Sequence, residues 1–275
     1  MVLGKIGFTL RKAVRVACLT MGALALLVVS DPVRAQTMLQ GLDLTSPAMT
    51  EAEMSREDVE AALAAAETPL DLTGKRLNGL DLSGLNLSGV ILRSARLNEA
   101  DLSNANLAGA VLDQAWALNV DLSGADLSDA HLFQAQLIGS SLDGADLSGA
   151  RVASDLSRAS LKGAKLTGAS LGADMQNQSM GLMRGVFKKA NLEAADLSGA
   201  DLSRVDFEFA NLKGANLAGA NLMRASLGGA DLTGANVDGA NFNEADVTSA
   251  KLKSLSGAES ANLEKARNLK AAFRD

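Results

Sequence analysis

The chain has 275 residues, a formal net charge of −6, and 47% hydrophobic but only 3% aromatic residues, with no tyrosine. Most of its apolar residues are Leu and Ala, so we expect a narrow core built from two side-chain sizes rather than an aromatic-rich globule. An acidic chain without a basic stripe is a poor match for phosphates, which excludes nucleic acid as an expected partner.

The first 35 residues have the pattern of a secretory signal peptide. Basic residues precede an apolar run over 16–29, and residues 33–35 read Val-Arg-Ala, a small-x-Ala cleavage site. The run has 14 residues, short of the ~20 that cross a bilayer. The sequence therefore predicts cleavage after Ala35, a periplasmic or secreted location, and no stable membrane span in the mature protein.

Cleavage at this site would change the composition of the protein. It would remove the only cysteine, Cys18, and leave 21 basic and 31 acidic residues, a net charge of −10. Disulfide and thiolate chemistry would then be absent from the mature chain.

Residues 36–69 are expected to form a polar leader followed by a short helix. Residues 36 to about 54 are polar and show no clear period. Ser55 then stands where a helix N-cap would, with the carboxylate of Asp58 three residues later, and apolar residues follow at positions 59, 62, 63 and 66 until Pro69. This amphipathic helix is expected to cover the start of the next segment.

From residue 70 to 253 the sequence repeats every five residues. We count 35 units, of which 28 are centred on Leu, and their consensus is Ala-(Asp/Asn)-Leu-Ser-Gly. A period of five fits neither a helix nor a strand, so it describes a unit that turns. In such a unit Leu and Ala point inward, while Ser and Gly form a corner in which Gly tolerates φ > 0.

This repeat resembles the pentapeptide-repeat family. The resemblance covers about two thirds of the chain and implies an all-β fold, a right-handed quadrilateral β-helix with four units, or 20 residues, per coil. Such a solenoid needs caps at its ends. At the C-terminus, apolar residues at 255, 258, 263, 266, 269 and 273 predict a capping helix over 254–275, through which a homodimer could also form.

The repeat is irregular at 172–186. The units centred on positions 156 to 171 are one residue out of phase, and the motif is lost around 175–184, where three Met occur within ten positions. Met180 and Met183 could belong to a protruding, adaptable contact loop or could fill a decayed pair of coil sides. Because 35 residues, or seven units, separate Val152 from Phe187, the coil count can be preserved through this defect.

Outward residues spaced by 20 should stack in columns along the rod. One column contains Asp81, Asp101 and Asp121, and another contains Arg76, Arg96 and Trp116. The acidic column could be a surface for a basic partner, or a DNA mimic as the resemblance to gyrase-protecting members implies. It could instead be simply the Asp/Asn position of the repeat, which accepts local backbone hydrogen bonds and keeps the rod soluble. The second column is a further candidate surface, although the indole could instead cover the core beside Ala117.

No catalytic set, cofactor site or metal site is expected. His131 is the only histidine, and it lacks the clustered ligands of a metal centre. Stacked carboxylates do occur in carbohydrate-cleaving β-helices, and that alternative predicts a polysaccharide activity lost in Asp101→Ala. The sequence favours an exported, non-enzymatic scaffold that binds a protein partner, with a gyrase-directed DNA mimic and a polysaccharide-binding or polysaccharide-cleaving β-helix as the two alternatives.

Overall fold

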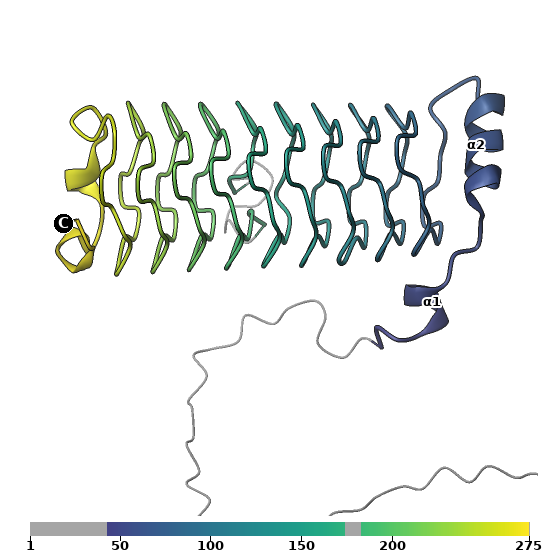
Figure 1. Ribbon diagram of the computed structural model, residues 1–275, viewed down its shortest axis with the longest axis horizontal. Coiled ribbons are helices and arrows are strands. Elements are labelled where there is room, and N and C mark those ends of the chain that lie inside the picture. Colours follow the sequence, from purple (N-terminus) through teal and green to yellow (C-terminus); the bar gives the residue numbers. More distant parts are fainter. Residues whose placement is uncertain (1–42, 174–182, 275) are drawn as a thin grey trace, which may run out of the picture. The chain divides into compact units, whose positions relative to one another are not determined.

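The computed structural model describes residues 43–173 and 183–274, which form a rod of stacked four-sided coils (Figure 1). The predicted signal peptide over 1–35 and most of the leader lie outside the described residues. Among the helices that the structure describes, none combines the length and hydrophobicity needed to cross a bilayer.

Each side of a coil pairs with the same side of the next coil. Asp71, for example, forms a parallel bridge with Ile91, 20 residues further on. The Leu72 N–H donates to the Ile91 carbonyl at 2.7 Å, and the Ile91 N–H donates to the Leu70 carbonyl at 2.9 Å. Each side contributes a single bridge, so no side is long enough to be a regular strand. The bridges of successive coils nevertheless line up as hydrogen-bond ladders along the rod. The coil of four five-residue units is confirmed.

A tight turn forms each corner of the coil. At the first corner the Lys75 N–H donates to the Leu72 carbonyl at 3.1 Å, and Gly74 has a φ of 69°. A positive φ at the third residue of the turn is the requirement of a type II turn. Glycine occupies about half of these corners, and side chains as large as Phe209, with a φ of 59°, occupy others.

The core contains the two side-chain sizes that the composition predicts. Central leucines such as Leu102, and the alanines two positions before each centre, such as Ala105, are fully buried. Three centres hold phenylalanine instead, and the rings of Phe187 and Phe207 lie 5.3 Å apart in neighbouring coils. The core is therefore one continuous column along the rod.

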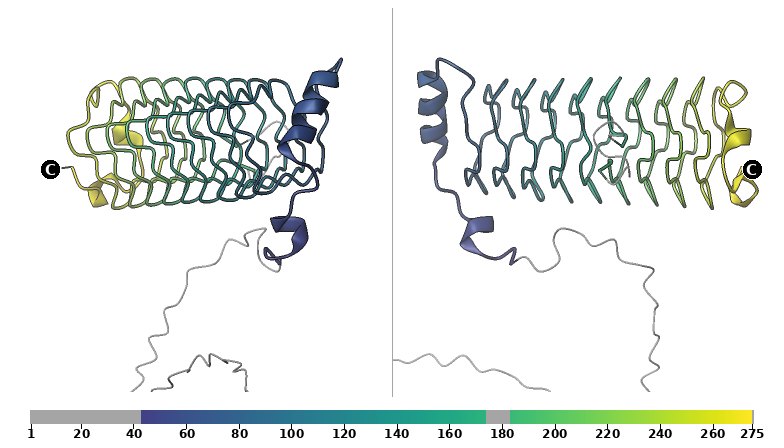
Figure 2. Two further views of the ribbon diagram at one scale, coloured as in Figure 1. Left: turned by 45° about the vertical axis from the view of Figure 1, so that its right-hand side comes forward. Right: turned by 180° about the vertical axis from the view of Figure 1, so that it is seen from behind.

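Two helices precede the first coil. The first, α1 (Pro47–Thr50), was not predicted, and the second, α2 (Arg56–Ala65), begins at the predicted N-cap. The Asp58 N–H donates to the Ser55 hydroxyl, and the Ser55 N–H donates to the Asp58 carboxylate, so the expected capping box is present. Helix α2 lies across the end of the rod (Figures 1 and 2), where Val59 is fully buried against the core.

The prediction of a C-terminal helix over 254–275 is wrong. Residues 254–274 contain only two short 3₁₀ segments, η1 (Leu263–Lys265) and η2 (Leu269–Ala271), and the chain continues the ladder between them and after η2. The Arg267 N–H donates to the Ala245 carbonyl and the Phe273 N–H to the Ala250 carbonyl, both at 2.8 Å. A short helix without packing partners is only marginally stable, whereas here the backbone groups form hydrogen bonds with the preceding coil. A homodimer formed through a C-terminal helix thus loses its basis.

The irregular region divides into a shortened side and an insertion. Gln136 bridges Asp155, 19 residues on, and Asp155 bridges Val186, 31 residues on. One residue is therefore missing at the corner after Val152, as the phase shift predicts, while eleven extra residues lie between Leu171 and Phe187. The chain makes five sides between Val152 and Phe187 rather than the seven expected, and the coils stay in register because Val186 takes the place beside Asp155 in the ladder.

Candidate interaction surfaces

The acidic column stacks as predicted. Asp81, Asp101 and Asp121 bridge one another in consecutive coils. The Oδ1 atom of each accepts the N–H two residues later, from Ser83, Ser103 and Ser123, at 2.9 Å in each case. Nearly the same local bond recurs at the Asp/Asn position along the whole rod, with distances up to 3.3 Å. These carboxylates therefore stabilise the corners, which is the structural role that the sequence left open.

Asp81 has a second structural role because α2 binds it. Arg56 of α2 donates to the Asp81 carboxylate at 3.0 Å, to the Asp81 carbonyl at 3.0 Å, and to the Ser83 carbonyl at 3.1 Å. The Ser83 hydroxyl and backbone, together with the Arg56 guanidinium, lower the pKa of Asp81. Asp81 is thus part of the helix attachment, and the open acidic surface is reduced to Asp101 and Asp121.

The N-terminal segment also occupies part of the column that contains Arg76, Arg96 and Trp116. These three residues bridge in order, as predicted. Glu53 pairs with Lys75 at 3.2 Å and with Arg76 at 3.4 Å. Arg96 and Trp116, both partly buried, lie beyond this ion pair.

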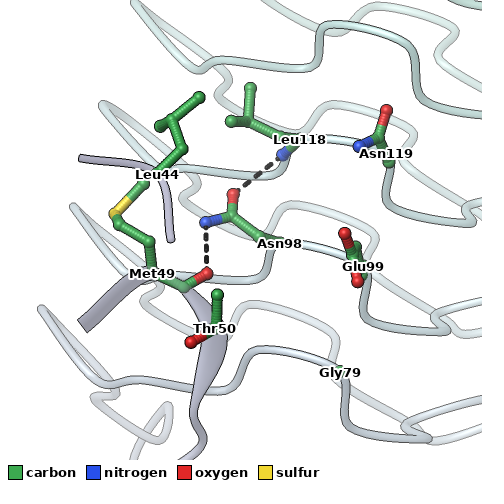
Figure 3. A pocket seen from close by; sticks show the side chains of 8 residues that line it. All are labelled: Leu44, Met49, Thr50, Gly79, Asn98, Glu99, Leu118 and Asn119. Atoms are coloured by element: carbon green, nitrogen blue, oxygen red, sulfur yellow. Dashed lines mark hydrogen bonds between the residues drawn. The ribbon is translucent and has the colours of Figure 1, made fainter. Parts of the chain in front are cut away.

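A small pocket lies where α1 meets the rod (Figure 3). Its volume is about 140 Å³, and its walls include Leu44, Met49 and Leu118. The Asn98 side chain crosses it, donating to the Met49 carbonyl at 3.1 Å and accepting the Leu118 N–H at 3.0 Å. Small-molecule sites usually exceed about 300 Å³, so this pocket is better explained as the seam that attaches α1.

The two candidate methionines, Met180 and Met183, belong to the insertion. Met180 lies outside the described residues. Met183 is partly buried, and the Gln134 side-chain amide donates to its sulfur at 3.1 Å. The end of the insertion thus packs on the rod.

An ion-pair network directly after the insertion was not predicted from the sequence. Asp206 is 5% exposed and lies 3.8 Å from Arg184 and 3.3 Å from Lys188, which also pairs with Glu208 at 3.0 Å. Although partial burial opposes it, the carboxylates of Glu208 and Asp206 raise the pKa of Lys188. The spacing of 20 between Lys188 and Glu208 was the available signal. This network fixes the C-terminal end of the insertion to the next coil.

Phe209 is the second feature that the sequence analysis missed. It is a corner residue that is 63% exposed, the most exposed large hydrophobic side chain among the described residues. Its ring lies over Gly229 of the following coil, where its atoms come within 2.7 Å of the position that a Cβ would take. The available signal was a large aromatic residue at the position where the repeat prefers Gly.

Metal-binding side chains are not grouped in the part of the chain that the structure describes. No three His, Cys, Asp or Glu side chains there are placed to hold one metal ion. His131 is partly buried, with Val111 and Arg151 beside it in its column. What the geometry offers is a rigid, patterned surface.

The family can be assigned from these repeats. The model for pentapeptide repeats matches in eight copies, over residues 76–114, 95–132, 118–151, 186–222 and 220–254, which together cover more than half of the chain. The chain belongs to the pentapeptide-repeat family. The unmatched stretch of this pentapeptide-repeat protein, 152–185, coincides with the shortened side and the insertion.

Solved structures of other family members are similar to this protein. HetL from the cyanobacterium Nostoc, described as involved in heterocyst differentiation regulation, is 32% identical, with a TM-score of 0.59 over 80% of this chain and 96% of HetL. The β-helix is therefore shared with HetL.

Two further likenesses are weaker. QnrB1, a plasmid-mediated fluoroquinolone resistance protein, is 20% identical, with a TM-score of 0.46 over 75% of this chain and 90% of QnrB1. A protein of the Arabidopsis thaliana thylakoid lumen is 34% identical, with a TM-score of 0.35 over 39% of this chain and 68% of its own. TM-scores below 0.5 support no conclusion about this chain. No curated protein sequence matches.

Proposed function

We propose that this pentapeptide-repeat protein is an exported, non-enzymatic scaffold that binds another protein of the cell envelope or the secreted fraction. The observation that carries the proposal is that the polar side chains of the repeat are engaged in hydrogen bonds that stabilise the fold. The Asp and Asn side chains of the repeat accept corner N–H groups, as Asp101 and Asp121 do, and so support the rod instead of forming a reactive cluster. A rigid surface of this kind suits recognition.

Two further points support a binding role. The apolar run over 16–29 and the cleavage pattern at 33–35 favour export. HetL, the family member with the same β-helix, is described as involved in regulation, which fits a protein that acts through contacts.

In this proposal α2 protects the first coil. An open coil end presents unpaired backbone groups and apolar side chains, which invite association with other chains. Val59 is the buried anchor of α2, and the Arg56–Asp81 pair fixes its orientation. At the other end, Asn262 and the segment around η1 and η2 continue the ladder past the last complete coil.

Fractionation followed by affinity capture tests the proposal. The full-length protein with a C-terminal tag should be recovered outside the cytoplasm, with a mature N-terminus at Gln36, and should reproducibly retain a partner protein after mild cross-linking. The tag alone, exported by the same signal, is the control. Recovery in the cytosol with an intact N-terminus would overturn export and favour the gyrase-directed alternative, which predicts protection of DNA supercoiling from quinolones. Repeated capture of no partner would overturn the scaffold role.

A further inference from the structure

We infer that the partner binds the face that carries Phe209, and that it does so through an acidic protein segment with an apolar anchor residue. This inference rests on the scaffold function proposed above and names its surface and the chemistry of its partner. We call the residues Phe209, Arg204, Lys189 and Arg158 the Phe209 patch.

The four residues lie at the two corners that bound one face of the rod. Arg204 and Phe209 occupy the two corners that flank the side over 205–208. Lys189 and Arg158 occupy the same corner as Phe209 in the two preceding coils, because the Arg158 N–H donates to the Lys188 carbonyl and the Lys189 N–H to the Glu208 carbonyl. Adjacent coils are about 4.8 Å apart, so one short peptide segment could contact all four residues.

The backbone of Phe209 adopts a conformation that is unfavourable for a bulky residue. Its φ of 59° is in the left-handed region, which is uncommon and unfavourable for a bulky side chain. The ring is 63% exposed and rests on Gly229, so it gains little burial in return. A strained and exposed aromatic residue is suited to a contact that is made only in a complex.

The charges of the patch are opposite to those of the rod. Lys188 and Arg224 on this face pair with Glu208 and Glu244. Arg158, Lys189 and Arg204, in contrast, form no ion pair with any described residue. The pKa of Glu244 is lowered mainly by its ion pair with Arg224 and, to a smaller extent, by the nearby charge of Arg204. Three cations that form no ion pair with a described residue, placed around one aromatic side chain, complement an acidic segment that carries one apolar residue.

Other anionic partners fit this face less well. Asp155, Asp206 and Glu208 lie on the same face, and the whole chain has a net charge of −6, so an extended polyanion or an anionic membrane would meet carboxylates as well as cations. Phenylalanine and arginine are instead both enriched at protein–protein interfaces.

Selection of displayed random 12-residue peptides on the full-length protein tests the inference. Enriched peptides should contain Asp or Glu together with an aromatic or large aliphatic residue. Phe209→Asn should weaken their binding at least about tenfold, and Arg204→Gln about two- to fivefold, more strongly at low salt. The Phe209→Asn variant should keep or increase its thermal stability, because Asn tolerates the left-handed conformation. Loss of folding therefore cannot explain lost binding.

Two matched variants serve as controls. Phe273→Asn removes the other exposed phenylalanine, and Arg93→Gln removes one charge from the opposite half of the rod; neither should change binding. Peptides without acidic residues, or equal binding by Phe209→Asn, would overturn the inference while leaving a scaffold that binds elsewhere. Binding of anionic vesicles or of DNA that depends on Phe209 would also overturn it, as would self-association that depends on Phe209.

Discussion

The coils before and after the insertion have the same backbone arrangement but differ in how their stacked polar side chains interact. After it, Asn residues join successive coils: Asn221 donates to Asp201 at 3.1 Å and accepts from Asn241 at 3.0 Å. Before it, Asp101 and Asp121 stack with no bond between their carboxylates. An amide can donate and accept at once, whereas a carboxylate only accepts. The second half thus gains side-chain bonds between coils, while the first half keeps stacked negative charge.

Replacing Phe207 by Ala should have the largest effect on stability. Phe207 is fully buried and lies 5.3 Å from Phe187, so its truncation should cost about 3–5 kcal/mol of unfolding free energy. Hydrogen exchange should show that the loss is concentrated in the coils after the insertion, because each coil contacts only its neighbours. Phe207→Leu, the residue of most other units, should cost less than half as much. Equal loss of protection in both halves would contradict this local response.

Converting an amide ladder into an acidic stack should have the next largest effect. In Asn221→Asp the donor to Asp201 is lost and two carboxylates face each other, so we expect a loss of about 1–3 kcal/mol near neutral pH. Urea unfolding at pH 7 and pH 4 provides the measurement, since protonation should restore part of the stability. Asn221→Ser, which adds no charge, is the control. An Asn221→Asp variant as stable as the parent would show that the ladders contribute little.

Acid should weaken the second half through Asp231. Partial burial would raise the pKa of this carboxyl, but the Thr233 hydroxyl and the Lys251 ammonium outweigh it and lower the pKa to about 2. A carboxyl whose pKa is lowered in the folded protein stabilises the fold at pH values above its pKa in the unfolded chain, about 3.8. This stabilisation is lost as the pH falls toward 2. We expect a decrease on the order of 1–2 kcal/mol over this window. Lys251→Met should reduce the decrease, and an unchanged pH profile would contradict the pairing.

The reverse substitution in the first half should have the smallest effect and the opposite sign. Asp101→Asn keeps an acceptor for the Ser103 N–H and adds a donor toward Asp81 or Asp121, so we expect a gain of about 0.5–1 kcal/mol. Thermal unfolding at low and high salt measures it, and the gain should shrink at high salt, where the parent's repulsion is screened. A loss of stability would mean that the acidic stack is not a source of strain.

The sequence predicted the fold well because almost every residue contributes to it. The centres, the preceding alanines and the corners follow from one period, and Ser55 with Asp58 follows from local capping chemistry. The C-terminal helix was predicted wrongly because its apolar spacing also suits one more partial coil. Asn262, which precedes Leu263 as Asn precedes Leu in the repeat and donates to Asn241, was the overlooked signal.

The candidate surface was predicted less well. Stacking of Asp101 on Asp121 followed from the spacing, but their local bonds, and the use of Asp81 and Arg76 by the N-terminal segment, depend on contacts between residues far apart in sequence. Phe209 was not predicted as a contact residue, although it stands at the corner position where the repeat prefers Gly, because the period identifies the corner but not how far a side chain there is exposed.

Photo-cross-linking in intact cells tests the binding account most directly. A photoreactive phenylalanine analogue would be placed singly at positions 209, 101 and 273 of the full-length protein. The account predicts an adduct with another protein from position 209, rich in Asp or Glu at the cross-linked segment, and none from position 273. Adducts from position 101 alone would show that the partner binds the acidic column and not the Phe209 patch. Absence of a protein adduct from all three positions would contradict the scaffold role itself.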